Sequence, residues 1–174
     1  MARLLPILIA LAGCTFGRPL SPPPPTAVRM ILADGVRIEA EKNLTAEGWQ
    51  FDLLDSSKRG QTAVNESEEW DENQAWVTFA ARKGDDPTPV VLSPTDATPI
   101  LRGVRSDVRK LVSAAGGEVL ETAEGENYRE RWVTISYKVD KIGGWVRASV
   151  RPATDRAEET TNRLEITVRE QPLR

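Results

Sequence analysis

The stretch RWVTISYKV, residues 131–139, decides the fold because apolar and polar side chains alternate along it. A period of two is typical of a β-strand with one buried and one solvated face. The stretches GWVRASVR at 144–151 and NRLEITVRE at 162–170 alternate in the same way. Three such strands in succession predict an antiparallel sheet with one face packed against a helix. The side chains expected to point inward are Val133, Ile135, Tyr137, Val139, Val146, Ala148, Val150, Leu164, Ile166 and Val168.

The helix that would cover this face comes before the strands. Thr98 is the expected N-cap with Pro99 as the first helical residue, and Gly116 and Gly117 predict its end. A short strand, EVLET at 118–122, is expected to follow it. The apolar stripe of this helix consists of Ile100, Leu101, Val104, Val108, Leu111, Val112 and Ala115.

Residues 26–47 allow two interpretations. MILADGVRIEA would form a hairpin if Asp34-Gly35 were its turn. Alternatively, apolar residues recur every four positions, as they do on one face of a helix that Thr26 caps and Gly48 ends. We favour the helix. Its apolar face would consist of Val28, Leu32, Val36, Ala40 and Leu44.

The pattern between residues 49 and 99 predicts short strands. Trp49, Phe51 and Leu53 alternate with polar residues, which indicates a strand. The expected elements after it are a turn at SSKRG (56–60), a weak strand in QTAVNESEEW (61–70), a turn at DENQ (71–74), a strand at AWVTFAAR (75–82) and a proline-rich connector with a short strand at 90–92. The acidic run at 65–73 lacks the ligand spacing of an EF-hand loop and is expected to be a solvated hairpin tip.

The two halves of the chain resemble each other. Trp76 aligns with Trp145, and the apolar positions of the two expected helices align with one another. We therefore predict an α+β protein, with two helices packed on antiparallel sheets and built as two tandem αβββ halves. The first half would span residues 27–93, and the second, with an extra edge strand, residues 94–174.

The chain opens with an apolar run, Leu4–Ala12, that ends near the only cysteine, Cys14. About nine residues fall far short of the roughly 20 needed to span a bilayer, so the run predicts the core of a signal peptide. Leu11-Ala12-Gly13-Cys14 resembles the lipobox of bacterial lipoproteins. The resemblance implies that residues 1–13 are removed and that Cys14 carries the lipid that anchors the chain. The alternative is a buried N-terminal helix with a chance cysteine.

The residues after the cysteine point to a place in the envelope. Enteric bacteria retain lipoproteins in the inner membrane by an Asp at the next position, so by the same resemblance Thr15 implies the outer membrane. Residues 18–26, RPLSPPPPT, favour an extended polyproline II spacer of about 3.1 Å per residue. We expect residues 14–26 to form a lipidated tether that holds the folded part in the periplasm.

Composition excludes several chemistries. Histidine is absent and the single thiol would carry lipid, so Ser-His-Asp triads, Cys-His pairs and His-ligated zinc are excluded. No G-x-S-x-G, S-x-x-K or P-loop motif is present. The net charge of −3 becomes −4 once Arg3 is removed, which argues against nucleic acid as a partner. We expect no catalytic residue, cofactor or metal.

Three tryptophans are the first candidates for a binding surface. Trp76, Trp132 and Trp145 each precede a valine of the inward register, so their side chains are expected on the opposite, polar face. Indoles are costly to leave in water, so three of them on polar faces predict a surface that binds a protein or a glycan. The alternative is that a second sheet or loops cover the rings.

Three arginines are the second candidates. Arg102, Arg105 and Arg109 recur at helical spacing and form a basic edge beside the apolar stripe. Guanidinium groups suit phosphate geometry, so this edge would fit lipid head groups. The alternative is a solvated helix face.

A second, looser resemblance concerns the whole fold. Gly48 and Trp49 lead into an amphipathic strand with Phe51 and, later, Asp55, which resembles the helix-grip domains of BamC-type lipoproteins. That family implies a part in the machine that inserts β-barrels into the outer membrane. We therefore expect a non-catalytic binding or scaffolding subunit of an envelope protein complex. The alternatives are a periplasmic glycan- or lipid-binding module and a periplasmic enzyme that works without histidine.

Overall fold

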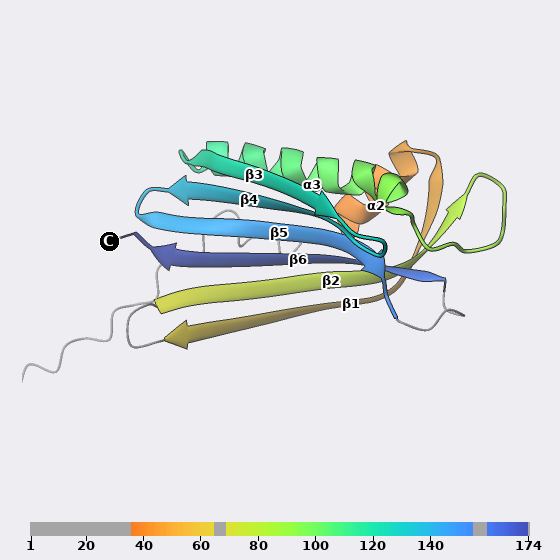
Figure 1. Ribbon diagram of the computed structural model, residues 1–174, viewed down its shortest axis with the longest axis horizontal. Helices are drawn as coiled ribbons and strands as arrows, with labels where there is room; N and C mark the ends of the chain where they lie inside the picture. The colour runs from red at the N-terminus through yellow and green to blue at the C-terminus, as the bar shows by residue number, and fades with distance from the viewer. Residues whose placement is uncertain (1–35, 65–68, 155–159, 174) are drawn as a thin grey trace, which may run out of the picture.

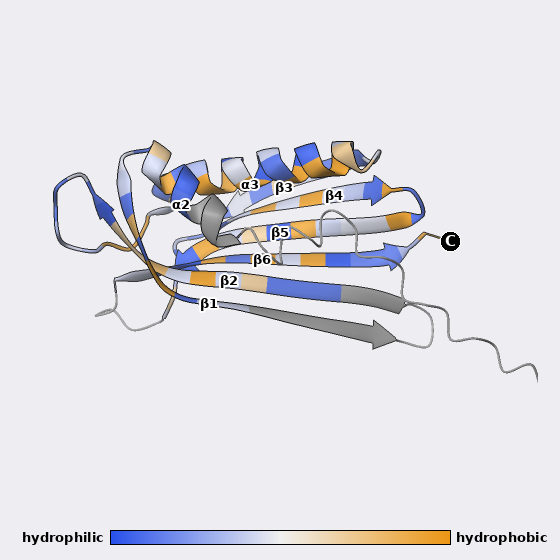
Figure 2. Ribbon diagram, turned by 180° about the vertical axis from the view of Figure 1, so that it is seen from behind, coloured by the Kyte–Doolittle hydropathy of each residue, from blue (hydrophilic) through white to orange (hydrophobic). Residues whose placement is uncertain are grey.

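The computed structural model describes residues 36–64, 69–154 and 160–173, and within them two helices lie on one side of a single sheet (Figures 1 and 2). The predictions for residues 1–35, including Cys14 and the tether, lie outside the described residues. The helices are α2 (Val36–Ala46) and α3 (Pro94–Ala114). The strands are β1 (Trp49–Val64), β2 (Glu69–Lys83), β3 (Glu118–Glu126), β4 (Arg131–Val139), β5 (Ile142–Pro152) and β6 (Thr161–Pro172).

All neighbouring strands are antiparallel, in the order β1-β2-β6-β5-β4-β3. The α+β class and the antiparallel sheet are confirmed. The inward side chains predicted for β4, β5 and β6 are all buried, since the alternation keeps one face of each strand against the helices. Helix α3 packs on β3, β4 and β5, whereas α2 packs on β1, β2 and β6.

The first half of the chain does not have the three strands that its sequence predicts. Strand β1 continues through residues 56–60, and β2 continues through residues 71–74, so neither predicted turn exists. The polar residue Ser56 pairs with Val77, and this ladder overrides the local turn preference of the sequence. One helix and two long strands therefore replace the first αβββ unit, and both halves of the chain join one sheet.

Helix α2 settles the ambiguity at its own residues. Residues 36–46 are helical, so the hairpin interpretation is wrong, and the part of the prediction before residue 36 lies outside the described residues. Gly48 and Gly116, at φ of 79° and 74°, end α2 and α3 as predicted. The two helices meet where the Asn43 side chain lies against Gly103. A Cβ at position 103 would overlap that side chain, so the close contact requires glycine there.

Helix α3 begins one turn earlier than predicted. Its N-cap is Ser93, whose hydroxyl oxygen accepts a hydrogen bond from the Asp96 amide at 3.2 Å, and Pro94 is the first helical residue. Thr98, the predicted cap, instead donates its hydroxyl proton to the Pro94 carbonyl at 3.2 Å, and Pro99 lies inside the helix. The sequence contains two consecutive Ser/Thr-Pro cap signals, and the earlier one starts the helix.

A buried asparagine fixes the connector between β2 and α3. Asn162 is fully buried at the start of β6. Its side-chain oxygen accepts from the Leu92 amide at 2.8 Å, and its side-chain nitrogen donates to the Val90 carbonyl at 3.0 Å. Val90 also forms an isolated bridge with Ala81, in the region where the sequence predicts a short strand.

Candidate binding face

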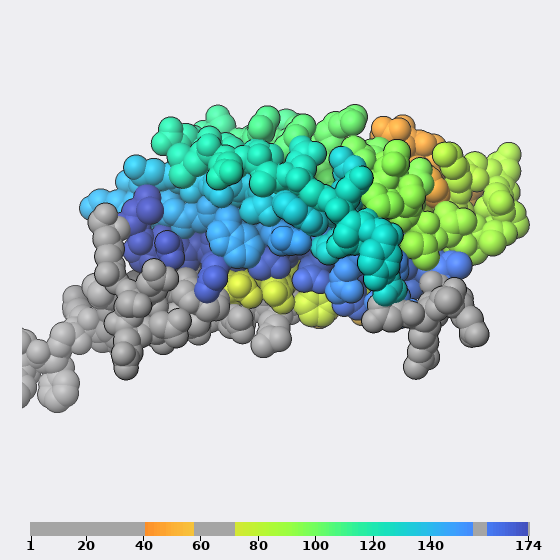
Figure 3. Space-filling view, in the orientation of Figure 1, coloured from red at the N-terminus to blue at the C-terminus, as the bar shows by residue number. Residues whose placement is uncertain are grey.

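The side of the sheet away from the helices is called here the open face, and the view of Figure 3 shows the side chains of β5 and β6 across its middle. Its side chains alternate along each strand with the buried ones that face the helices. On the four central strands they are Glu72, Gln74, Trp76, Thr78, Ala80 and Arg82 of β2, Arg163, Glu165, Thr167 and Arg169 of β6, Trp145, Arg147, Ser149 and Arg151 of β5, and Trp132, Thr134, Ser136 and Lys138 of β4.

The register places two of the predicted tryptophans in one row across the sheet. Trp76 pairs with Glu165, Glu165 with Ser149, and Ser149 with Trp132. Three strand spacings separate the two tryptophans, so their backbones are about 14 Å apart. Trp145 lies on the same face, four residues before Ser149 on β5.

Arginines cover these indoles in part. The guanidinium carbon of Arg147 lies 4.7 Å from the ring centroid of Trp132, and that of Arg163 lies 5.8 Å from the ring centroid of Trp76. These are cation–π contacts. The Trp132 ring also lies against Gly125 of β3, where an added Cβ would come within 2.2 Å of it. These contacts leave Trp76 and Trp132 half-buried, and Trp145 is half-buried as well.

The centre of the open face is basic. Among the side chains described on its four central strands, six are cations and two are carboxylates, in a chain whose net charge is −3. Arg151 pairs with Glu165 at 3.4 Å, and Arg147 reaches Glu130 at 3.7 Å. The cations are Arg82, Lys138, Arg147, Arg151, Arg163 and Arg169. Acidic residues sit on the edge strands instead, for example Asp52 of β1, which pairs with Arg82, and Glu121 of β3.

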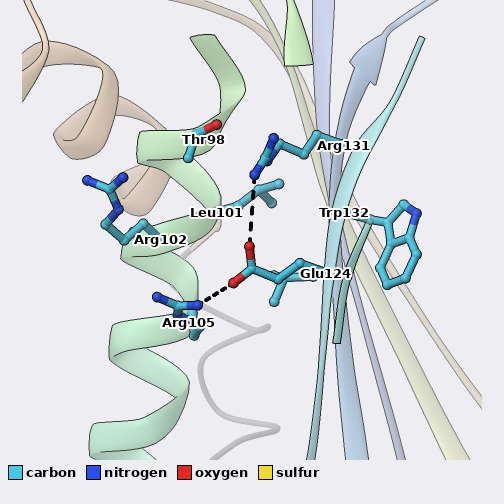
Figure 4. A pocket seen from close by; sticks show the side chains of 8 residues that line it. Thr98, Leu101, Arg102, Arg105, Glu124, Arg131 and Trp132 are labelled. Atoms are coloured by element: carbon cyan, nitrogen blue, oxygen red, sulfur yellow. Dashed lines mark hydrogen bonds and ion pairs between the residues drawn. The ribbon is translucent and has the colours of Figure 1, made fainter. Parts of the chain in front are cut away.

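The predicted basic edge of α3 lies on the other side of the sheet. Arg105 forms an ion pair with Glu124 of β3, and Arg109 is 3.5 Å from the Thr122 hydroxyl. Arg102 is exposed, and Figure 4 shows it pointing away from Glu124. Arg102 and Arg105 line one pocket with Trp132, but the Trp132 ring points to the opposite side of the sheet (Figure 4). Arg105 and Arg109 instead attach α3 to the edge strand of the sheet.

A pocket of about 190 Å³ lies between α3 and the β3–β4 hairpin (Figure 4). Leu101 and Val133 form its apolar wall. The Glu124 carboxylate lies in it, near the guanidinium of Arg105 and 3.9 Å from that of Arg131. Arg131 also pairs with Glu126 at 2.5 Å. The protein's own carboxylates already pair with these guanidinium groups, and the Arg105–Glu124 pair attaches α3 to β3. The pocket is therefore a weaker candidate for a binding site than the open face.

The sequence identified the tryptophans but not the groups that surround them. Arg147, Arg163 and Glu165 alternate with buried residues, and this was the available signal for their face. Their contact with particular tryptophans depends on the pairing of β2 with β6, which joins distant parts of the chain. No local pattern predicts such a pairing.

Across residues 36–64, 69–154 and 160–173, no group of three or more acidic, cysteine or histidine side chains is arranged to hold a metal ion. None of the helices described is both long and apolar enough to cross a membrane. No protein-family model, curated protein or solved structure matches the chain.

Proposed function

We propose that this chain is a membrane-anchored, non-catalytic binding subunit of a bacterial envelope assembly, and that it binds an acidic protein partner through the open face. The lipobox around Cys14 supports the anchor, and Thr15 favours the outer membrane with the folded part in the periplasm. The helix-grip resemblance favours the machine that assembles outer-membrane β-barrels as the complex concerned. No histidine is available for the common hydrolytic mechanisms, which favours binding over catalysis.

The composition of the open face carries the proposal. Tryptophan and arginine are the residues most enriched among the energetically dominant positions of protein interfaces. Here Trp76, Trp132 and Trp145 share a face with six cations, while the two described helices, α2 and α3, lie against the other face. A basic centre in an acidic protein is complementary to a partner with exposed carboxylates, and it would speed the encounter between them.

A glycan is the second candidate ligand, because Glu165 and Ser149 lie between two indoles and would offer polar contacts to a sugar. Sugar rings, however, stack on bare indole faces. Arg147 and Arg163 already lie over Trp132 and Trp76. This contact favours the protein partner.

We further infer that the fold arose by duplication of a unit smaller than αβββ. Helix α2 leads to the edge strand β1 and then to the inner strand β2, and α3 leads to the opposite edge strand β3 and then to β4. Under this relation the counterpart of Trp76 is Trp132, in the shared sequence Trp-Val-Thr, and not Trp145 as the sequence alignment proposes.

Co-purification of the tagged full chain from detergent-solubilised envelopes tests the proposed function. We expect one protein to be recovered in a fixed ratio, and Lys138→Glu with Arg147→Glu to lower its recovery at least about tenfold, because charge reversal on the open face repels an acidic partner. Cys14→Ala should remove both fatty-acid labelling and membrane attachment.

The matched control reverses two exposed cations on α3, Arg102→Glu with Lys110→Glu, which changes net charge equally. Equal loss in the control, or unchanged recovery in the open-face variant, would contradict the proposal. Recovery of the chain with a bound sugar and no protein would favour the glycan.

A further inference from the structure

The open face repeats itself about a pseudo-two-fold axis that passes through the sheet between β6 and β5. Glu165 and Ser149 face each other there, one on each side of the axis. Trp76 pairs with Glu165 in the strand next to β6, and Trp132 pairs with Ser149 in the strand next to β5. Rotation by half a turn therefore places one tryptophan on the position of the other.

The arginines that cover the two indoles obey the same relation. Arg163 comes two residues before Glu165 and pairs with Thr78, while Arg147 comes two residues before Ser149 and pairs with Thr134. Each guanidinium lies over the tryptophan of the neighbouring strand. We call each such pair a clamp. The first clamp is Trp76 with Arg163, and the second is Trp132 with Arg147.

The spacing of the clamps fits an extended chain. Arg163 lies opposite Arg151, which is four residues beyond Arg147 on the adjacent strand. A rise of about 3.4 Å per residue and a strand spacing of about 4.8 Å place the two arginine backbones about 14 Å apart. Two carboxylates four residues apart on an extended peptide are separated by about 13 Å.

We propose that the two clamps bind one extended acidic segment of the partner, in which two carboxylates lie four residues apart. A guanidinium that lies over an indole still offers the N–H groups at its edge, and these suit a carboxylate. A second copy of this chain would present the same basic centre and would be repelled. This inference rests on the proposed function and specifies the chemistry that its binding face recognises.

Between the clamps lie Ser149, which is only 7% exposed, and Glu165, whose carboxylate is paired with Arg151 at 3.4 Å. That ion pair offsets the negative charge of Glu165 along the path of an acidic segment. Within the described part of the chain, the ionic partner of Arg147 is Glu130 at 3.7 Å, which is partly exposed, so an incoming carboxylate can replace that contact at little cost.

Titration of the full-length protein with synthetic peptides, followed through the indole N–H signals in NMR spectra, tests the inference. The probe is acetyl-Ser-Glu-Thr-Ser-Thr-Glu-Ser-amide, compared with a peptide whose glutamates are two residues apart and one in which both are glutamine. We expect the first peptide to bind at least about fivefold more tightly than either of the others, and to lose this advantage in high salt.

Single variants test whether both clamps take part. Arg147→Gln and Arg163→Gln should each weaken binding by a similar factor, about fivefold, and the double variant by about the product of the two. Arg102→Gln, on the other side of the sheet, should leave binding unchanged. Arg147→Lys and Arg163→Lys keep the charge and serve if a glutamine variant does not fold.

Three results would overturn the inference: no binding of the first peptide up to millimolar concentration, equal binding of the two spacings, or equal effects of Arg102→Gln and Arg147→Gln. If an acidic protein nevertheless co-purifies through the open face, the proposed function stands and only the two-clamp recognition fails. If the peptides bind as expected but no protein co-purifies, the proposed function fails separately.

Discussion

The two faces of the same sheet differ in what their side chains contact. On β4, Ile135 is fully buried under α3, while the neighbouring Thr134 lies on the open face opposite Arg147 of β5. The helix side consists almost wholly of aliphatic and aromatic groups, whereas the open side combines tryptophan, arginine and hydroxyl groups. Because successive residues serve opposite faces, one strand can provide stability with one set of side chains and recognition with the other.

The largest loss of stability should come from a substitution on the helix side of the sheet. Ile135→Ala removes buried methyl groups between the sheet and α3, and it should lower the free energy of unfolding by about 3 kcal/mol. Thr134→Ala, the next residue but on the open face, should change it by less than about 0.5 kcal/mol. Urea denaturation of both variants measures the difference. Similar losses would show that the open face is also core.

A buried polar group on the helix side should matter nearly as much. Asn162→Ala leaves the Leu92 amide and the Val90 carbonyl without their partner, so we expect a loss of about 2 kcal/mol. The same substitution should also accelerate hydrogen exchange at the Leu92 amide, which loses its acceptor. The control is the exposed Asn127, whose side-chain oxygen accepts from the amides of Arg129 and Glu130. Asn127→Ala should lower the free energy of unfolding by well under half as much as Asn162→Ala.

The comparison also explains which features the sequence predicts. Strict alternation in β4, β5 and β6 assigns every residue to a face, and the C-terminal ends of both helices follow from their terminal glycines. The unbroken β1 could not be predicted, because Ser56 and its neighbours are turn formers that only pairing with β2 holds extended. The contact of Arg163 with Trp76 likewise requires the pairing of β2 with β6. Long-range pairing thus decides the site more than local pattern does.

A smaller effect is expected within each clamp. Double-mutant cycles that combine Trp132→Leu with Arg147→Gln, and Trp76→Leu with Arg163→Gln, should each give a coupling energy of about 0.5–1 kcal/mol in unfolding. The pseudo-two-fold relation predicts that the two energies are similar. A coupling near zero in both cycles would mean that the arginines and indoles do not interact in solution.

The smallest expected effect is a change in the pKa of Asp86, in the exposed connector that follows β2. Hydrogen bonds from the Thr88 amide, at 2.9 Å, and from its hydroxyl hold the pKa of Asp86 below its ordinary value of 3.8. A carboxyl with a lowered pKa adds stability above its unfolded-state pKa and loses it as the pH falls through the folded-state pKa. Carboxyl carbon NMR should show Asp86 titrating below 3.8, and Thr88→Ala should raise its pKa.

Site-specific photo-crosslinking in intact cells tests most directly whether the two sides of the molecule have different tasks. A photoreactive residue at Thr134, on the open face, is compared with one at Ser106, on the exposed side of α3. We expect a discrete crosslink to an acidic envelope protein from position 134 and none from position 106. A crosslink to that protein from position 106 alone would contradict it.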